Sequence, residues 1–128
     1  MKKIAFLGLM FSGLFFIGTA WGESFDGGKV AQVMEINLSS LRKAHEAVAA
    51  REDYNAAAAF YAIAHADRAL LSMDPPQGSK ADWDRLFHRL IDTALEGVGA
   101  AGEHNHARQV ELLRRLEDIR NAGHAEFR

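Results

Sequence analysis

Four stretches follow one another along the chain in which apolar side chains recur every three or four residues. This spacing places the apolar positions on one face of an α-helix. The alternating runs typical of strands are nearly absent, and Ala, Leu, Arg, Glu and Lys, which favour helices, dominate. The pattern predicts helices from about 28 to 51, from 53 to the Pro75-Pro76 break, from 79 to about 102, and from 103–105 to the C-terminus.

Each predicted helix has an apolar face that we expect to point inward. These positions are Met34, Leu38, Leu41, His45 and Val48 in the first helix; Phe60, Ile63, Ala64, Leu70 and Leu71 in the second; Trp83, Phe87, Leu90, Ala94 and Val98 in the third; and Leu113, Leu116, Arg120, His124 and Phe127 in the fourth. We expect Asp53 to cap the second helix, and Ser79 with Asp82 to form a capping box on the third.

Helices of similar length with short connections pack most simply as an all-α, antiparallel up-down-up-down four-helix bundle. In this topology the two chain termini and the connection between the second and third helices meet at one end. We expect the Pro75-Pro76 loop to close over a group of largely apolar side chains there. The group consists of Met34, Leu70, Leu71, Trp83, Phe87, Ile119, Arg120, His124 and Phe127.

The N-terminal segment predicts a secretory signal peptide rather than part of the bundle. Its features are the positive residues Lys2 and Lys3, an apolar run over 4–17, and the small residues Ala20 and Gly22. We expect cleavage after residue 22, which leaves one domain over 23–128. The alternative is an uncleaved membrane anchor, because the apolar stretch 4–21 is almost long enough to span a bilayer.

Composition narrows the chemistry that the bundle can perform. The full chain has 15 Lys and Arg against 17 Asp and Glu, with no basic cluster of the kind that binds nucleic acid. It has no cysteine, which excludes disulfides, thiolate zinc sites, iron–sulfur clusters and thioether-linked haem. No nucleophile or phosphate-loop motif is present, and we expect no enzymatic activity. The ligands left for a metal or cofactor are imidazole, thioether and carboxylate.

The bundle topology places a thioether and an imidazole at the same end. Met34 lies near the start of the domain and His124 near its end, and both face an apolar space lined by aromatic residues. One methionine and one histidine can fill the two axial positions of haem iron. Arg120 lies one turn before His124, where it could contact the haem edge or a propionate, or form an ordinary surface ion pair.

Several short motifs resemble those of the soluble cytochrome b562 family. They are the ending R-N-A-G-H-A-E-F-R over 120–128, Met34-Glu35 near the start of the domain, Asp74-Pro75-Pro76 in the loop, and Asp82-Trp83 with Phe87. The C-terminal motif is the most specific of them, and the resemblance extends over essentially all of 23–128.

This resemblance implies a periplasmic electron-transport protein. It implies that Met34 and His124 are the axial ligands of one haem b per chain, bound without a covalent link. Redox proteins of unknown identity would be its partners, and no membrane contact is expected after signal cleavage. The sequence does not fix the oligomeric state, and a monomer is the expectation that we carry forward.

Two positions depart from the family pattern. Asn37 stands three residues after Met34, where an apolar residue is expected, and Gly123 replaces an aromatic residue before His124. Glycine costs a helix about 1 kcal/mol relative to alanine, and we expect it to loosen the final turn. Both departures are expected to weaken haem retention without abolishing it.

The other histidines leave a second function open. His104 and His106 form an H-x-H pair that would bind copper, nickel or zinc, or would simply be a polar connection. His65 and His88 would form a second metal site if they lie level on neighbouring helices, and His45 is expected to be an inward histidine with a hydrogen-bond partner. The alternative function is a haem-free periplasmic bundle that binds copper or zinc through His and Met.

Overall fold

The computed structural model describes residues 24–127 and contains four α-helices in this part of the chain. They are α2 (Gly27–Ala49), α3 (Asp53–Asp67), α4 (Lys80–Gly102) and α5 (His106–Phe127), with a 3-10 turn, η2 (Arg68–Leu70), after α3. The predicted signal peptide lies outside the described residues. Within them, no helix combines the length and the apolar character that a bilayer span requires.

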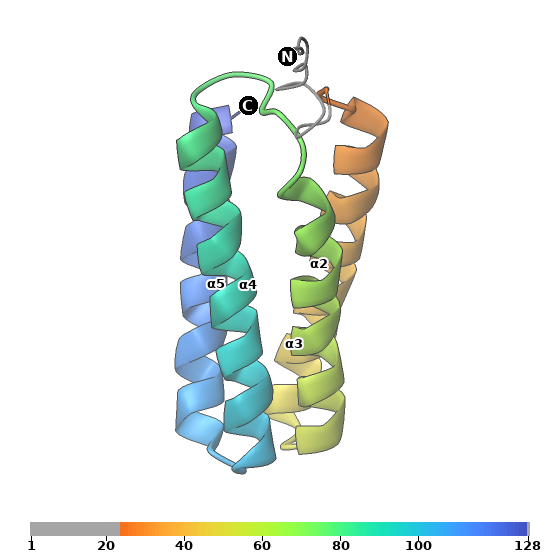
Figure 1. The fold of residues 1–128 in the computed structure, drawn as a ribbon. Helices are drawn as coiled ribbons and strands as arrows, with labels where there is room; N and C mark the ends of the chain where they lie inside the picture. Colours follow the sequence, from red (N-terminus) through yellow and green to blue (C-terminus); the bar gives the residue numbers. More distant parts are fainter. Residues whose placement is uncertain (1–23, 128) are drawn as a thin grey trace, which may run out of the picture.

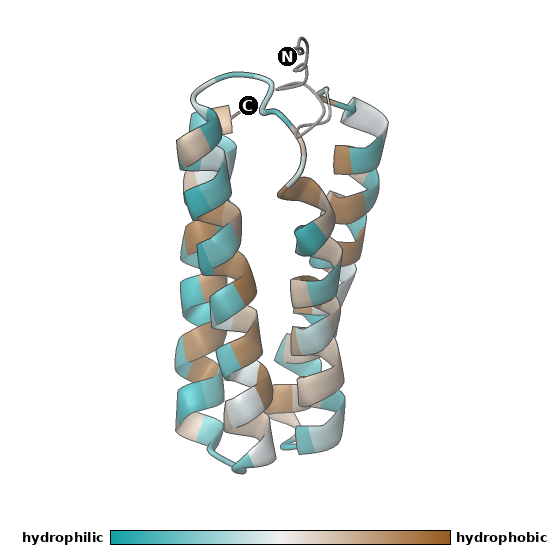
Figure 2. Cartoon of the chain, viewed as in Figure 1, coloured by the Kyte–Doolittle hydropathy of each residue, from teal (hydrophilic) through white to brown (hydrophobic). Residues whose placement is uncertain are grey.

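Successive helices run in opposite directions, which confirms the predicted up-down-up-down bundle (Figure 1). The connection between α3 and α4 crosses the end at which α2 begins and α5 finishes. Apolar surface faces the interior between the helices (Figure 2). Helix α3 packs extensively on both α2 and α4, whereas α2 and α5 touch over a much smaller area.

The helix ends follow local capping chemistry. The Ser79 hydroxyl accepts a hydrogen bond from the Asp82 backbone N–H at 3.0 Å, which confirms the predicted cap of α4. The predicted cap at Asp53 is wrong by one position, because Glu52 is the N-cap and Asp53 is the first helical residue. An acidic residue in the first turn still interacts favourably with the helix dipole. Asn105 precedes α5, and its side-chain oxygen accepts a hydrogen bond from the Arg108 backbone N–H at 3.1 Å.

The buried face of α2 is rotated from the predicted one. Leu38 is 51% exposed, and His45 also lies at the surface, where its Nε2 is 2.8 Å from a Glu117 carboxylate oxygen of α5. The predicted hydrogen-bond partner of His45 therefore exists, but its inward position was wrong. The residues that α2 buries are Val33, Asn37, Ser40, Leu41, Ala44, Ala47 and Val48. The rotation escaped the sequence pattern because two of these residues are polar.

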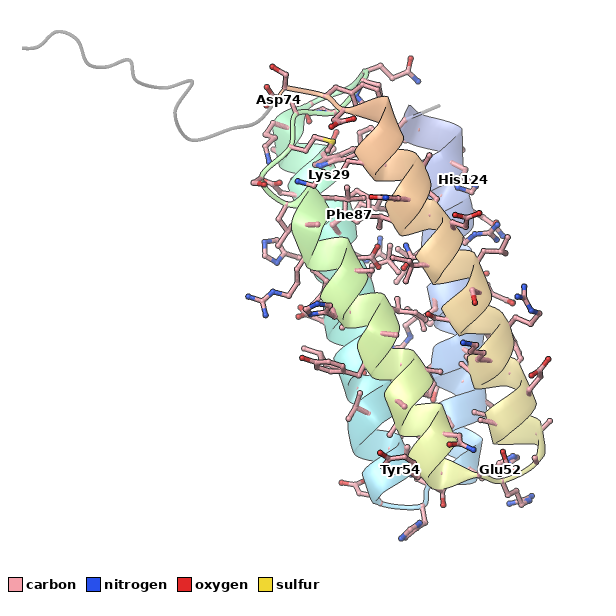
Figure 3. All side chains as sticks on the ribbon, turned by 90° about the vertical axis from the view of Figure 1, so that its right-hand side faces the viewer. Lys29, Glu52, Tyr54, Asp74, Phe87 and His124 are labelled. Atoms are coloured by element: carbon pink, nitrogen blue, oxygen red, sulfur yellow. The ribbon has the colours of Figure 1, made fainter. Side chains whose placement is uncertain are left out.

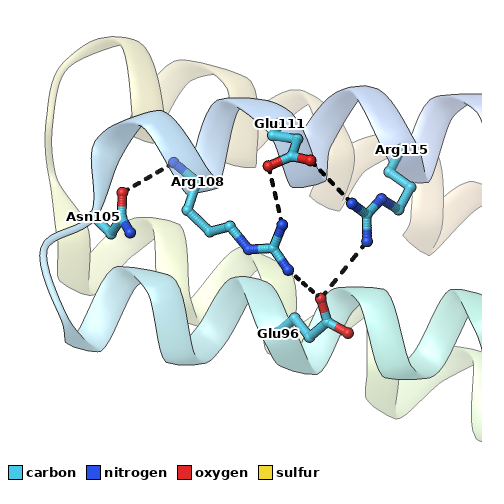
Figure 4. Close-up of polar contacts among 5 residues, drawn as sticks. All are labelled: Glu96, Asn105, Arg108, Glu111 and Arg115. Atoms are coloured by element: carbon cyan, nitrogen blue, oxygen red, sulfur yellow. Dashed lines mark hydrogen bonds and ion pairs between the residues drawn. The ribbon is translucent and has the colours of Figure 1, made fainter.

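A network of ion pairs joins α4 to α5 on the outside of the bundle (Figure 4). The Arg108 guanidinium bonds Glu96 at 2.8 Å and Glu111 at 3.0 Å, and Arg115 bonds Glu111 at 3.0 Å. Exposed pairs of this kind each contribute about 0–1 kcal/mol. The Arg108–Glu96 pair fixes α5 against α4, whereas the two Glu111 pairs lie within α5. Between α2 and α5, the contact described above is the single pair of His45 and Glu117.

Candidate functional site

A cavity lies at the bundle end where the chain termini meet. Its volume is about 260 Å³, close to the lower limit of common ligand pockets, and it is partly open to solvent. All four helices contribute aliphatic side chains to its wall, and Pro76 of the α3–α4 connection adds to it, as the predicted loop position requires. The aromatic part of the wall consists of Phe25, Trp83, Phe87 and Phe127.

Met34 and His124 both line this cavity, and both are half-buried. They also border a shallower groove on the outer side, which lies between α2 and α5. The structure therefore brings together the thioether and the imidazole that the topology predicted to meet, from opposite ends of the domain. Figure 3 shows His124 at the same end of the bundle as Asp74 of the α3–α4 connection, with Phe87 between the helices nearby.

Arg120 has the position that the sequence suggested, one helical turn before His124. It contributes to both the cavity and the outer groove. Of its two interpretations, the surface ion pair is not observed, since no carboxylate within the described residues pairs with the Arg120 guanidinium. A guanidinium that has no carboxylate partner in the described part of the chain, and that lies at the mouth of an apolar cavity, suits a ligand that carries a carboxylate.

Trp83 anchors the aromatic wall. Its indole Nε1 donates a hydrogen bond to the backbone oxygen of Leu70 at 2.7 Å. Its ring meets Phe87 and Phe127 in edge contacts, with ring centroids 4.7 and 5.2 Å apart. The predicted aromatic pair on α4 is thus in contact, and Phe127 of α5 completes it. Because the indole is held at both its polar and its apolar side, this wall is preformed.

Gly123, one of the departures from the family pattern, has a packing function. A Cβ at this position would lie 2.7 Å from Leu86 Cδ2, closer than packed carbon atoms approach. The glycine therefore lets α4 come close to α5 immediately before His124. The helix does not end at Gly123, because α5 continues through Phe127. Gly97 lets α3 approach α4 in the same way, since a Cβ there would collide with the Phe60 ring.

Asn37, the second departure, pairs with a carboxyl that sequence reasoning missed. Asn37 lines the cavity, and its Nδ2 donates a hydrogen bond to Asp67 Oδ1 at 2.6 Å. Asp67 is fully buried, and burial raises its pKa to about 7 although the hydrogen bond from Asn37 opposes the increase. The available signal was its position, because Asp67 continues the buried face of Phe60, Ile63 and Ala64 on α3.

The two histidines of the H-x-H pair have protein partners. His104 Nδ1 is 2.7 Å from Asp53 Oδ2, and His106 Nε2 is 3.0 Å from the Val48 backbone oxygen. Hydrogen bonds from Gln109 and His104 lower the pKa of Asp53. These contacts hold the α4–α5 connection against the end of α2 and the start of α3, and they correspond to the polar-connection interpretation of the H-x-H pair.

His65 stacks on Tyr61, with ring centroids 6.0 Å apart and an interplanar angle of 20°. His65 and His88 are both exposed. Among the described residues, no group of three or more His, Asp or Glu side chains is placed to hold a metal ion.

The chain matches no known family model, no curated protein and no solved structure.

Proposed function

We propose that this chain is a periplasmic electron-transfer haemoprotein that binds one haem b without a covalent link. Met34 and His124 would be the two axial ligands of its iron. The observation that carries the proposal is that a thioether and an imidazole, from opposite ends of the domain, line one aromatic cavity. The Met34-Glu35, Trp83 and C-terminal motifs that resemble cytochrome b562 support it independently.

The residues around the cavity fit a flat apolar cofactor with acidic edges. Aromatic and aliphatic side chains provide the apolar walls, and Arg120 provides a positive charge at the opening for a propionate. When bound, haem supplies a reversible one-electron couple. His124 would bind as neutral imidazole, and the soft sulfur of Met34 favours ferrous iron.

The two ligands also restrict the chemistry. With Met34 and His124 both bound, neither axial position is left for oxygen or a substrate, which favours electron transfer over oxygenase or peroxidase chemistry. The half-buried ligands border the outer groove between α2 and α5, which gives a redox partner a short approach to the site. The predicted signal peptide supports the periplasmic location.

Visible spectroscopy of the purified chain with added haemin tests the proposal. We expect saturation at one haem per chain and sharp α and β bands after reduction. His124→Ala should lose haem, and Met34→Ala should lose the low-spin bands while it still binds haem. His88→Ala and Met73→Leu serve as controls, because His88 is exposed and Met73 is buried outside the cavity wall; both should resemble the wild type.

The same purified chain distinguishes the haem proposal from the alternative function, a haem-free bundle that binds copper or zinc. A chain that stays colourless with haemin but binds Cu(II) or Zn(II) stoichiometrically would contradict the haem proposal and support the metal-binding bundle. Acid extraction that releases all of the haem would agree with non-covalent attachment, as the absence of cysteine requires.

A further inference from the structure

A buried acid and a buried amide join α2 to α3 beside the cavity. Asp67 has no exposed surface, and Asn37 is 9% exposed and forms part of the cavity wall. One hydrogen bond links them, from Asn37 Nδ2 to Asp67 Oδ1 at 2.6 Å. Within the described part of the chain, the buried side-chain atoms without a hydrogen-bond partner are Asn37 Oδ1 and Asp67 Oδ2, both from this pair.

One proton satisfies both of these atoms. An ionised Asp67 carboxylate can only accept hydrogen bonds, and the side-chain oxygen of Asn37 is also only an acceptor. Neither Asp67 Oδ2 nor Asn37 Oδ1 can therefore donate to the other. A protonated Asp67 donates from Oδ2 to Asn37 Oδ1 and closes a ring of two hydrogen bonds between acid and amide. Buried polar atoms without a hydrogen-bond partner destabilise a fold, which disfavours the ionised form. The geometry therefore favours the protonated acid.

We propose that Asn37 and Asp67 form a proton-binding site in the cavity wall, whose occupancy is coupled to the charge of the group bound in the cavity. The coupling rests on the proposed haem function, whereas the proton site itself does not. Asp67 is not one of the proposed haem ligands, and its partner Asn37 is a position at which the chain departs from the family pattern.

Burial, rather than any nearby charge, is the main influence on the pKa of Asp67. Its pKa of about 7 arises from burial, opposed only by the Asn37 hydrogen bond. On its own helix segment, His65 and Arg68 are exposed. Lys80 of α4 bonds the Leu71 backbone oxygen at 2.6 Å and pairs with Asp84.

Helix α5 contributes Arg120 and His124 to the cavity itself. None of these groups on α3, α4 or α5 contributes to the pKa shift of Asp67, and α2 presents the neutral Asn37. The proton therefore exchanges near neutral pH and responds to charge added nearby.

Added negative charge in the cavity raises the affinity of Asp67 for its proton, because charges interact strongly in a medium of low dielectric constant. An external one-electron donor that reduces ferric to ferrous iron adds one negative charge. Asp67 then takes one proton from solvent and becomes neutral, so that the electron and the proton cancel. Coupling of this kind is reciprocal, and protonation of Asp67 must therefore favour reduction.

The first test uses the protein without haem. Carbon-13 NMR of the Asp67 carboxyl should give a titration midpoint near pH 7, and the infrared band of a protonated carboxyl at pH 6 should disappear in Asp67→Asn. Asp92→Asn is the matched control, because Asp92 is exposed on α4. Asn37→Ala should change the midpoint, because it removes both the amide donor that favours the ionised acid and the amide oxygen that favours the protonated acid. An Asp67 midpoint below pH 5 would overturn the proton site.

The second test measures the midpoint potential of the haem-loaded protein from pH 5 to 9. In Asp67→Asn, the variant amide retains both hydrogen bonds to Asn37 but cannot titrate. The wild-type potential should fall as pH rises through neutrality, by at most 59 mV for each tenfold change in proton concentration. The Asp67→Asn potential should lack this component, while the haem propionates contribute equally to both proteins.

The two tests fail separately. Equal slopes in the wild type and Asp67→Asn would refute the coupling while haem binding stands. A chain that binds no haem would refute the proposed function, and the carboxyl titration would still decide the proton site. If Asp67→Asn fails to fold, the titration midpoint of the wild-type Asp67 carboxyl still decides the proton site.

Discussion

Replacement of Asp67 by asparagine should change how folding stability depends on pH. In the folded chain the pKa of Asp67 is raised from 3.8 to about 7, mainly by burial. Between these values the folded state holds a proton that the unfolded state has released. Stability contributed by Asp67 is therefore complete below pH 3.8, falls as pH rises, and is lost above about pH 7.

The size of this effect follows from the pKa difference. One pKa unit corresponds to about 1.4 kcal/mol, so the shift from 3.8 to about 7 amounts to about 4 kcal/mol over the whole range. About 2–3 kcal/mol of the free energy of unfolding is lost between pH 5 and pH 8, because the unfolded carboxyl is already largely ionised at pH 5. A change of this size is a large part of the 5–15 kcal/mol that stabilises an ordinary domain.

Urea unfolding of the haem-free protein, followed by circular dichroism at pH 5 and pH 8, measures it. Other ionisable groups also respond to pH, so the quantity to compare is the wild type minus Asp67→Asn, with Asp92→Asn as the control. We expect the wild type and the control to lose about 2–3 kcal/mol more than Asp67→Asn as pH rises. Parallel losses in the wild type and Asp67→Asn would refute a buried carboxyl of raised pKa.

Two substitutions test the packing of the candidate site. Gly99→Ala, with open space around it, should gain about 1 kcal/mol from helix propensity. Gly123→Ala should lose part or all of this gain, because the Leu86 side chain must shift to admit the new methyl group. Thermal unfolding compares the two variants, and equal stabilisation of both would contradict the close approach of Leu86 to Gly123. Trp83→Phe should cost about 0.5–1.5 kcal/mol, because the buried Leu70 carbonyl loses its 2.7 Å hydrogen bond from the indole and keeps only the 3.3 Å bond from the Met73 backbone N–H. Urea unfolding measures this cost, and unchanged stability would show that the indole hydrogen bond contributes nothing.

Much of the fold could be predicted because its signals are local. The Pro75-Pro76 break, the Ser79 cap and the apolar spacing fix where the helices begin and end. The short connections then determine their order in the bundle. This topology alone placed Met34 and His124 at one end, without any knowledge of side-chain contacts.

The errors and omissions concern properties that depend on a neighbouring helix. Asn37 is buried because α3 presents Asp67 to it, and this rotates the inward face of α2 away from Leu38. From the sequence alone Gly123 is only a weak helix former, and its packing function depends on Leu86 of the neighbouring helix α4. Hydrophobic spacing detects apolar residues that face a core, but it does not detect a polar pair that satisfies itself inside one.

Proton NMR of the reduced, haem-loaded protein shows whether Met34 and His124 bind the haem together, because the ring current of the macrocycle shields a methyl group held above its plane. We predict that the Met34 methyl resonance lies far upfield of the other protein signals. It should vanish in Met34→Leu and persist in Met73→Leu. A Met34 methyl at an ordinary chemical shift in the loaded, reduced protein would contradict Met34 as a haem ligand.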